Sequence, residues 1–171
     1  VYLGQGPRTD EGHEKAYKNA KDIFSSIYRT AEKYPDWVGI VKTPMEAAAL
    51  EKEGKIAMFI GIENGYPIGH DLNKIDEFYE LGARYITLCH SSNNDICDSS
   101  TDRHGPDYHG LSEFGYQVVD KMNDLGIMVD VSHTSDETFY DVIEHSKAPI
   151  IASHSSVRSI SNNPRNLDDD M

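Results

Sequence analysis

Apolar residues recur along this chain at two spacings that alternate from one end to the other. Steps of three and four residues are typical of an amphipathic helix, and short unbroken apolar runs are typical of a buried parallel strand. The predicted helices cover 11–33, 44–54, 71–82, 111–126 and 134–145, and the predicted strands cover 55–63, 84–90, 127–133 and 149–154, with strand-like pieces at 1–3 and 36–41. This alternation predicts an α/β protein with a parallel sheet.

The predicted helices carry recognisable end signals. Thr43 and Glu46 form a capping box around a proline at the first helical position, and Thr134 and Glu137 repeat the same spacing. Asp71 is placed to cap the helix predicted over 71–82. The glycines expected to end helices in the left-handed conformation are Gly54, Gly82 and Gly126.

Three consecutive segments repeat one pattern, in which a helix ends in glycine, an apolar strand follows, and a residue that can bind metal closes the strand. These closing residues are Glu63, His90 and His133, and a fourth copy without the glycine ends at His154. In parallel sheets the C-terminal ends of the strands are where functional sites are built. The pattern therefore predicts that four ligand-type side chains share one edge of the sheet.

The spacing of these residues favours a (β/α)8 TIM-barrel type fold. They follow one another at 27, 43 and 21 residues, and a barrel uses about 31 residues per unit. The longest interval contains a polar loop over 91–110. An open doubly wound sheet is the alternative. Four or five strands cannot close a barrel of eight, so we expect residues 1–171 to form a single partial domain covering roughly half of a barrel, with the first and last strands missing.

Composition narrows the classes of function. A net charge of −13 argues against nucleic acid and anionic membrane surfaces as partners. No apolar run approaches the roughly 20 residues that a membrane-spanning helix needs, and the first residues do not form a signal peptide. Cys89 and Cys97 fit neither a disulfide scaffold nor a zinc finger. The compartment is left open, with the cytoplasm slightly favoured over an extracytoplasmic location.

His133, His154 and Glu63 are the candidate metal ligands. Neutral imidazole is the commonest metal ligand in proteins, and two imidazoles on strand ends can converge on one ion. A buried, unpaired Glu63 carboxylate would be costly, whereas beside a cation it becomes favourable and can bridge two metal ions about 3.5–4 Å apart. The alternatives are ordinary hydrogen-bonded histidines and a glutamate paired with Lys or Arg.

Two further residues are candidates for contact with a substrate. His90 suits either a metal ligand or a donor to charge that develops on the substrate. Arg165 follows the fourth strand, where a guanidinium could clamp a carboxylate, although a surface arginine is the simpler interpretation. We expect the remaining histidines to be uninvolved, with His13 on the polar face of the helix over 11–33. The sequence contains no nucleophile elbow, Walker loop or Rossmann fingerprint.

Five motifs in this order resemble the membrane (renal) dipeptidase family, the M19 metallopeptidases, whose barrel is related to that of the amidohydrolases. The motifs are GIENG at Glu63, RYITLCHSSNN at His90, IMVDVSHTS at His133, PIIASHSS at His154 and NPRNLDDD at Arg165. The resemblance implies two zinc ions per complete enzyme. It implies that Glu63 bridges them, that His133 and His154 bind the second zinc, that His90 is catalytic and contacts substrate, and that Arg165 helps to bind the substrate.

The resemblance also implies an activity, the hydrolysis of dipeptides through a metal-bridging hydroxide, often with a D-residue at the C-terminal side. Two parts of the family pattern, a His-x-Asp pair on the first strand and a late Asp that carries a proton, do not occur in this sequence. Two alternatives are another amidohydrolase-type hydrolase, acting on lactones, cyclic amides or phosphotriesters, and an inactive metal-binding fragment. A dipeptide is the expected partner, and a homodimer is left open.

Overall fold

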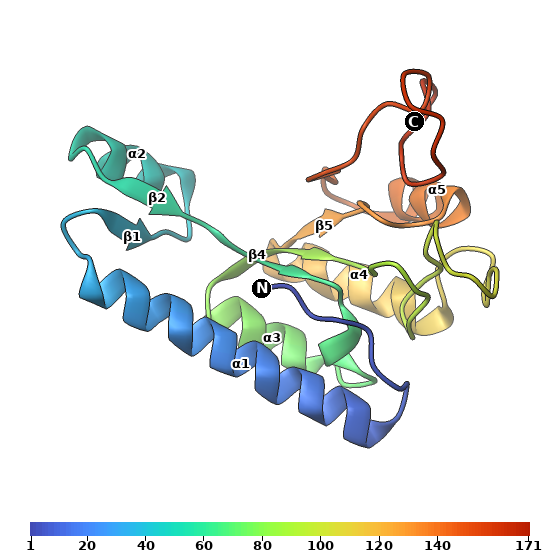
Figure 1. Cartoon of the computed structure of the whole chain (residues 1–171), viewed down its shortest axis with the longest axis horizontal. Coiled ribbons are helices and arrows are strands. Elements are labelled where there is room, and N and C mark those ends of the chain that lie inside the picture. Colours follow the sequence, from blue (N-terminus) through green and yellow to red (C-terminus); the bar gives the residue numbers. More distant parts are fainter.

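A computed structural model describes all residues of the chain, 1–171. Its centre is a three-stranded parallel sheet in the order β3-β4-β5, formed by Ile60–Glu63, Ala83–Thr87 and Met128–Asp130 (Figure 1). Glu63 is paired with Thr87, and Thr87 is paired with Asp130. The three strands therefore end level with one another, which confirms the predicted parallel α/β arrangement.

Helices flank this sheet and close its core. They are α1 (Asp10–Lys33), α3 (Asn73–Glu80), α4 (Glu113–Leu125) and α5 (Asp136–His145), with a short 3-10 helix, η1, at Tyr66–Ile68. The remaining helix, α2 (Pro44–Lys52), packs instead against β2 (Ile56–Met58), outside the central sheet. Helices α1, α3 and α4 lie along one face of the sheet in Figure 1. Ile62, Ile86 and Val129, one from each strand, belong to the same buried cluster as Phe78 of α3 and Val118 of α4. None of the helices is long and apolar enough to cross a membrane.

Two strand-like segments extend the sheet on both sides without forming regular strands. Tyr2 forms a parallel bridge to Glu63, and Ile151 forms one to Asp130. The strand predicted over 149–154 is therefore reduced to one bridge beside β5. Pro149 has no N–H to donate, and the Ser153 N–H donates to the Asp130 carboxylate instead of to a neighbouring strand.

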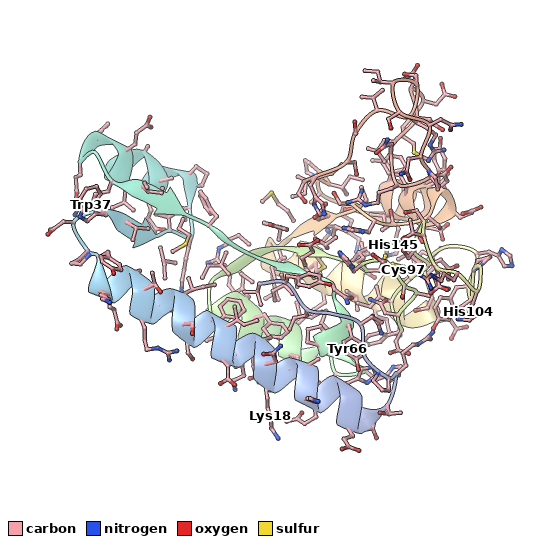
Figure 2. The ribbon with its side chains drawn as sticks, in the orientation of Figure 1. Lys18, Trp37, Tyr66, Cys97, His104 and His145 are labelled. Atoms are coloured by element: carbon pink, nitrogen blue, oxygen red, sulfur yellow. The ribbon has the colours of Figure 1, made fainter.

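The single strand predicted over 55–63 is divided in two. Its first half, β2 (Ile56–Met58), pairs with β1 (Val38–Ile40) in a separate two-stranded sheet, and only its second half joins the central sheet as β3. A continuous apolar run does not specify which neighbour each half pairs with. The small sheet and α2 project from the end of α1, where Trp37 is 72% exposed (Figures 1 and 2).

The helix caps agree with the sequence in part. The capping box of Thr43 and Glu46 is present, and Gly54, Gly82 and Gly126 all have positive φ. The second capping box, predicted at Thr134 and Glu137, does not form, because Ser135 caps α5 and its side chain accepts the Thr138 N–H. The cap predicted at Asp71 is also absent from α3, which begins after Leu72; the Asp71 carboxylate accepts the N–H of Asn73 in a turn.

The loop predicted over 91–110 contains isolated bridges and no regular helix or strand. It packs back over the ends of β4 and β5. Cys89, just before the loop, and Cys97, within it, are both buried free thiols.

Candidate metal centre

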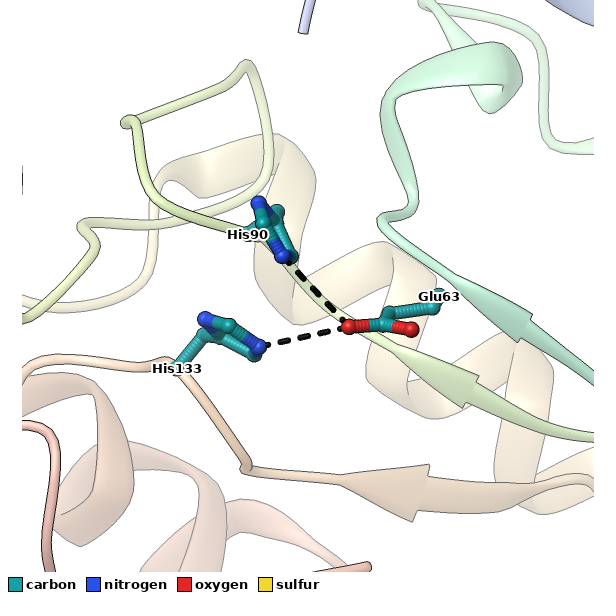
Figure 3. A group of neighbouring side chains, drawn as sticks. All are labelled: Glu63, His90 and His133. Atoms are coloured by element: carbon teal, nitrogen blue, oxygen red, sulfur yellow. Dashed lines mark ion pairs between the residues drawn. The ribbon is translucent and has the colours of Figure 1, made fainter. Parts of the chain in front are cut away.

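One carboxylate oxygen lies at the centre of a group of histidines at the C-terminal edge of the sheet. Glu63 Oε1 lies 3.5 Å from His90 Nε2, 3.4 Å from His133 Nε2 and 3.3 Å from His154 Nε2. Figure 3 shows His90 and His133 directed at this oxygen. The structure thus brings together the four strand-end residues that the repeated pattern singled out.

The local backbone explains how these side chains reach one point. Glu63 is the last residue of β3, whereas His90 and His133 each follow the end of their strand by three residues. His133 has φ 75°, a conformation that non-glycine residues rarely adopt and that costs free energy unless the surroundings hold it. Its carbonyl accepts hydrogen bonds from the Ser100 N–H at 2.9 Å and the Ser100 hydroxyl at 3.0 Å. These contacts with the 91–110 loop hold the strained turn.

His133 and His154 face each other across a short distance. Their Nε2 atoms are 2.9 Å apart. The His133 side chain is 11% exposed, the least of the four, whereas that of His154 is 43% exposed, so His154 lies at the open margin of the group. His90 lies on the other side, with its ring centroid 4.1 Å from that of His133.

The separations between these atoms fit a shared zinc ion. Zinc binds imidazole nitrogen at about 2.0–2.1 Å and carboxylate oxygen at about 2.0–2.2 Å in tetrahedral geometry, which places two ligand atoms about 3.3–3.4 Å apart. The distances from Glu63 Oε1 to His133 and His154 match this value, and the 2.9 Å histidine pair is slightly shorter. Two imidazoles and one carboxylate are also a known ligand set of catalytic zinc, with the fourth position left open.

A second ligand set overlaps the first. Ligand atoms of Glu63, His90 and His133 all lie within 4.8 Å of one another. The two sets share Glu63 and His133, and they differ in whether His90 or His154 supplies the third atom. Both roles that the sequence leaves open for His90 therefore agree with its position.

The electrostatics of the group favour neutral imidazoles. Burial, together with the Arg165 charge and the neighbouring imidazoles of His90 and His154, lowers the pKa of His133 to about 3. Burial also lowers the pKa of His90, although the Glu63 carboxylate opposes this shift. A neutral imidazole has a lone pair for a metal ion and does not need to lose a proton on binding.

Arg165 lies beside the candidate metal ligands. Its guanidinium donates to the Ser155 hydroxyl at 2.9 Å and to the His154 carbonyl at 3.2 Å. The Arg165 side chain is thus held against the segment that carries His154, and its remaining N–H groups are available to a ligand.

One histidine lies in an environment that the sequence analysis did not predict. His13 is 3% exposed, and its Nε2 lies 2.8 Å from Asp95 Oδ2 in the 91–110 loop. His13 was expected on the polar face of the helix over 11–33, and the structure buries it instead. No local signal marks it, because its partner is far away in the sequence. Asp130 was also missed, although a lone carboxylate inside the apolar run IMVDV is the same signal that identified Glu63.

A parallel α/β fold with imidazoles and a carboxylate gathered at the strand ends defines a candidate metal-dependent hydrolase. Residues 1–171, the whole chain, match the membrane dipeptidase family, peptidase family M19. The chain belongs to this family.

Curated relatives agree with this assignment. Dipeptidase verJ of Clonostachys rogersoniana is 43% identical over 145 residues, which cover 85% of this chain and 37% of the relative. Dipeptidase ataJ of Aspergillus terreus is 33% identical over 183 residues, covering 95% of this chain and 44% of the relative. The chain therefore spans less than half the length of these relatives.

Solved structures show the same relationship. The probable dipeptidase PvdM from Pseudomonas aeruginosa superimposes with a TM-score of 0.89 at 34% identity, covering 95% of this chain and 42% of that protein. A metallopeptidase from Rhodobacter sphaeroides, solved with a phosphinate mimic of the dipeptide L-Ala-D-Ala, has a TM-score of 0.86 at 26% identity, covering 92% of this chain and 46% of that protein.

Proposed function

We propose that this chain provides the second zinc site and the substrate-binding side of a zinc-dependent dipeptidase. The observation that carries the proposal is the convergence of His133 and His154 on Glu63 Oε1 at 3.3–3.4 Å. Family membership supports the reaction class, and the dipeptide mimic bound by the Rhodobacter relative supports a dipeptide as substrate. A substrate with a D-residue at its C-terminal side belongs to the same proposal.

Each residue has a defined task in this proposal. Glu63, His133 and His154 hold zinc, and the second carboxylate oxygen of Glu63 is available to a second ion. When bound, zinc would lower the pKa of its water to about 7 and so supply a nucleophile at neutral pH. Arg165 binds the free carboxylate of the dipeptide and so favours short peptides over long ones.

His90 is the proposed donor to the substrate carbonyl oxygen. Its Nδ1 lies 3.0 Å from the Ser91 hydroxyl. When Ser91 donates to Nδ1, the proton of the neutral ring is on Nε2, the atom that faces Glu63 and the centre of the site. Such a donor stabilises negative charge that develops on the carbonyl oxygen during attack.

Two substitutions in the full-length protein test the proposal. His154→Ala should remove zinc and the hydrolysis of L-Ala-D-Ala together. His90→Ala should lower kcat by about 10²–10³ while zinc is retained. His104→Ala, which removes an exposed histidine of the 91–110 loop, is the matched control and should change neither property.

Zinc content by mass spectrometry and initial rates of dipeptide hydrolysis are the measurements. Full zinc occupancy in the His154→Ala protein would overturn the ligand assignment. A wild type that binds zinc and hydrolyses lactones or phosphotriesters, but no dipeptide, would favour the alternative amidohydrolase-type activity. If the wild type binds zinc and hydrolyses none of these substrates, the remaining alternative is an inactive metal-binding protein.

A further inference from the structure

A buried carboxylate behind the histidines joins the ends of β4 and β5 to the strand-like segment beside β5. Asp130, the last residue of β5, is fully buried. Its Oδ1 accepts the N–H groups of Ser132 and Ser153, each at 3.0 Å, and its Oδ2 accepts the hydroxyls of Thr87 and Ser153, each at 2.6 Å. These partners come from the ends of β4 and β5 and from the segment that leads to His154.

The four hydrogen bonds keep this carboxylate ionised. Burial raises the pKa of Asp130, but the hydrogen bonds from Ser153, Thr87 and Ser132 outweigh it, so the pKa lies below its usual value. An ionised carboxylate only accepts hydrogen bonds. The hydroxyl hydrogens of Thr87 and Ser153 must therefore both point at Asp130.

This arrangement fixes the position of a proton on His154. Ser153 Oγ lies 2.7 Å from His154 Nδ1. The only hydroxyl hydrogen of Ser153 is already donated to Asp130, so Nδ1 must carry a hydrogen and donate it to Ser153 Oγ. His154 Nε2 then has a lone pair, and it is this atom that faces Glu63 Oε1 at 3.3 Å.

The backbone of His154 is held from the same place. Its N–H donates to the Ser132 hydroxyl at 3.0 Å, and Ser132 donates its own N–H to Asp130. The main chain and the ring of His154 are thus both tied to one buried carboxylate. Partners of this kind commonly set the tautomer and orientation of metal-binding histidines.

We propose that Asp130 and Ser153 are positioning residues that hold His154 as the Nδ1–H tautomer, with Nε2 ready for a metal ion. This inference rests on the proposed metal-binding role of His154. It has a second consequence for the metal-free protein. Because His154 Nε2 is an acceptor, His133 Nε2, 2.9 Å away, must carry the hydrogen between them. The two facing histidines are then opposite tautomers.

A matched pair of variants separates this role from simple stabilisation of the sheet. Ser153→Ala and Thr87→Val each remove one hydroxyl that donates to the same Asp130 oxygen at the same distance, 2.6 Å. Only Ser153 also contacts the His154 ring. A purely structural role predicts similar effects of the two variants on zinc affinity, whereas the positioning role predicts an effect of Ser153→Ala alone.

The experiment uses the full-length protein and two measurements. Zinc affinity is measured by competition with a chromophoric chelator. The tautomers of His133 and His154 are read from long-range ¹H–¹⁵N NMR spectra of the metal-free protein near neutral pH. We expect wild-type His154 to carry its proton on Nδ1 and wild-type His133 on Nε2. In Ser153→Ala we expect the His154 preference to be lost and zinc affinity to fall about 10–100-fold. In Thr87→Val both should remain close to wild type.

Several results would overturn the proposal. If wild-type His154 carries its proton on Nε2, the proposal is wrong. This result needs no variant, so the proposal can be tested even if Ser153→Ala does not fold. Equal losses of zinc affinity in the two variants would show that Asp130 only stabilises the sheet. If the wild type shows the expected tautomers and binds zinc but hydrolyses no dipeptide, the proposed function fails and this inference stands. If it hydrolyses dipeptides and Ser153→Ala changes neither tautomer nor affinity, the inference fails and the function stands.

Discussion

At the scale of single residues, Glu63 and Asp130 are two carboxylates at the ends of apolar strands with different surroundings. Glu63 faces three imidazoles, none of which donates a hydrogen bond to it within ordinary distance. Asp130 accepts four hydrogen bonds and forms no salt bridge. The first arrangement leaves an anion open to a metal ion, and the second satisfies the anion within the protein.

The hydrogen bonds of Asp130 predict a pH-dependent contribution to stability. Since its pKa is lowered in the folded protein, the carboxylate stabilises the fold fully above the unfolded value of about 3.9 and loses this contribution as pH falls through the folded pKa. Asp130→Asn should lower the free energy of unfolding at pH 7 by roughly 1–3 kcal/mol. Urea denaturation of the metal-free protein should show the difference from wild type shrinking below about pH 4. A difference that stays constant between pH 7 and pH 3 would contradict this explanation.

At the scale of elements, strand pairing brings the site together and depends on close contact between β3 and β4. Gly61 lies opposite Tyr85, and a Cβ atom at position 61 would lie 2.1 Å from the tyrosine ring. Glycine is therefore needed there for space, because its φ is not in the left-handed range.

Gly61→Ala should consequently destabilise the protein. Overpacking of this kind typically costs about 1–3 kcal/mol. Gly4→Ala is the control, because a Cβ there meets no atom within 4 Å. Chemical denaturation of both variants checks the prediction, and equal stability of the two proteins would show that the Tyr85 ring moves aside without cost.

The elements around the site could be predicted from the sequence because local signals specify them. The glycines that end helices and the apolar runs that form strands depend on neighbouring residues, and the residue closing each run is visible directly. The division of the 55–63 run was not predictable, since it depends on pairing of β2 with β1. The failed cap at Thr134 has a similar cause, because this hydroxyl donates to the Val131 carbonyl in the turn that carries His133.

The roles of the candidate site residues are less accessible to sequence than their positions. The motifs place Glu63, His133 and His154 together, and the distances agree. Which nitrogen of each ring carries a proton depends on Ser153 and Asp130, whose hydrogen bonds arise only when strand ends lie level. The role of His90 as ligand or donor stays a prediction, as does the expectation that residues 1–171 form a single partial barrel domain.

At the scale of the whole molecule, an ion-pair cluster fastens the N-terminal region to the loop over 91–110. Asp95 accepts from Arg8 Nε at 3.0 Å and lies 2.8 Å from His13 Nε2. Arg8 also donates to Asp107 at 2.6 Å. The cluster joins the segment before α1, the first turns of α1 and the loop that holds the His133 carbonyl.

Asp95→Asn should loosen these connections. We expect a loss of roughly 1–3 kcal/mol in the free energy of unfolding, because a buried imidazole and a guanidinium lose a charged partner. Faster hydrogen exchange should appear both in the first turn of α1 and in the loop over 91–110. Asp120→Asn, which removes the exposed partner of Lys147, is the control and should destabilise the protein less than Asp95→Asn does. Faster exchange confined to the loop would show that Asp95 does not connect the two regions.

The level ends of β3, β4 and β5 have one more consequence. Side chains alternate between the two faces of a strand, so sliding any one of these strands by a single residue would turn its polar end group away from the others. An ion held by Glu63 and the histidines would therefore bind only the correctly aligned sheet. By mass action, ion binding would stabilise that alignment over every shifted one. The cation would therefore select the correct strand register during folding.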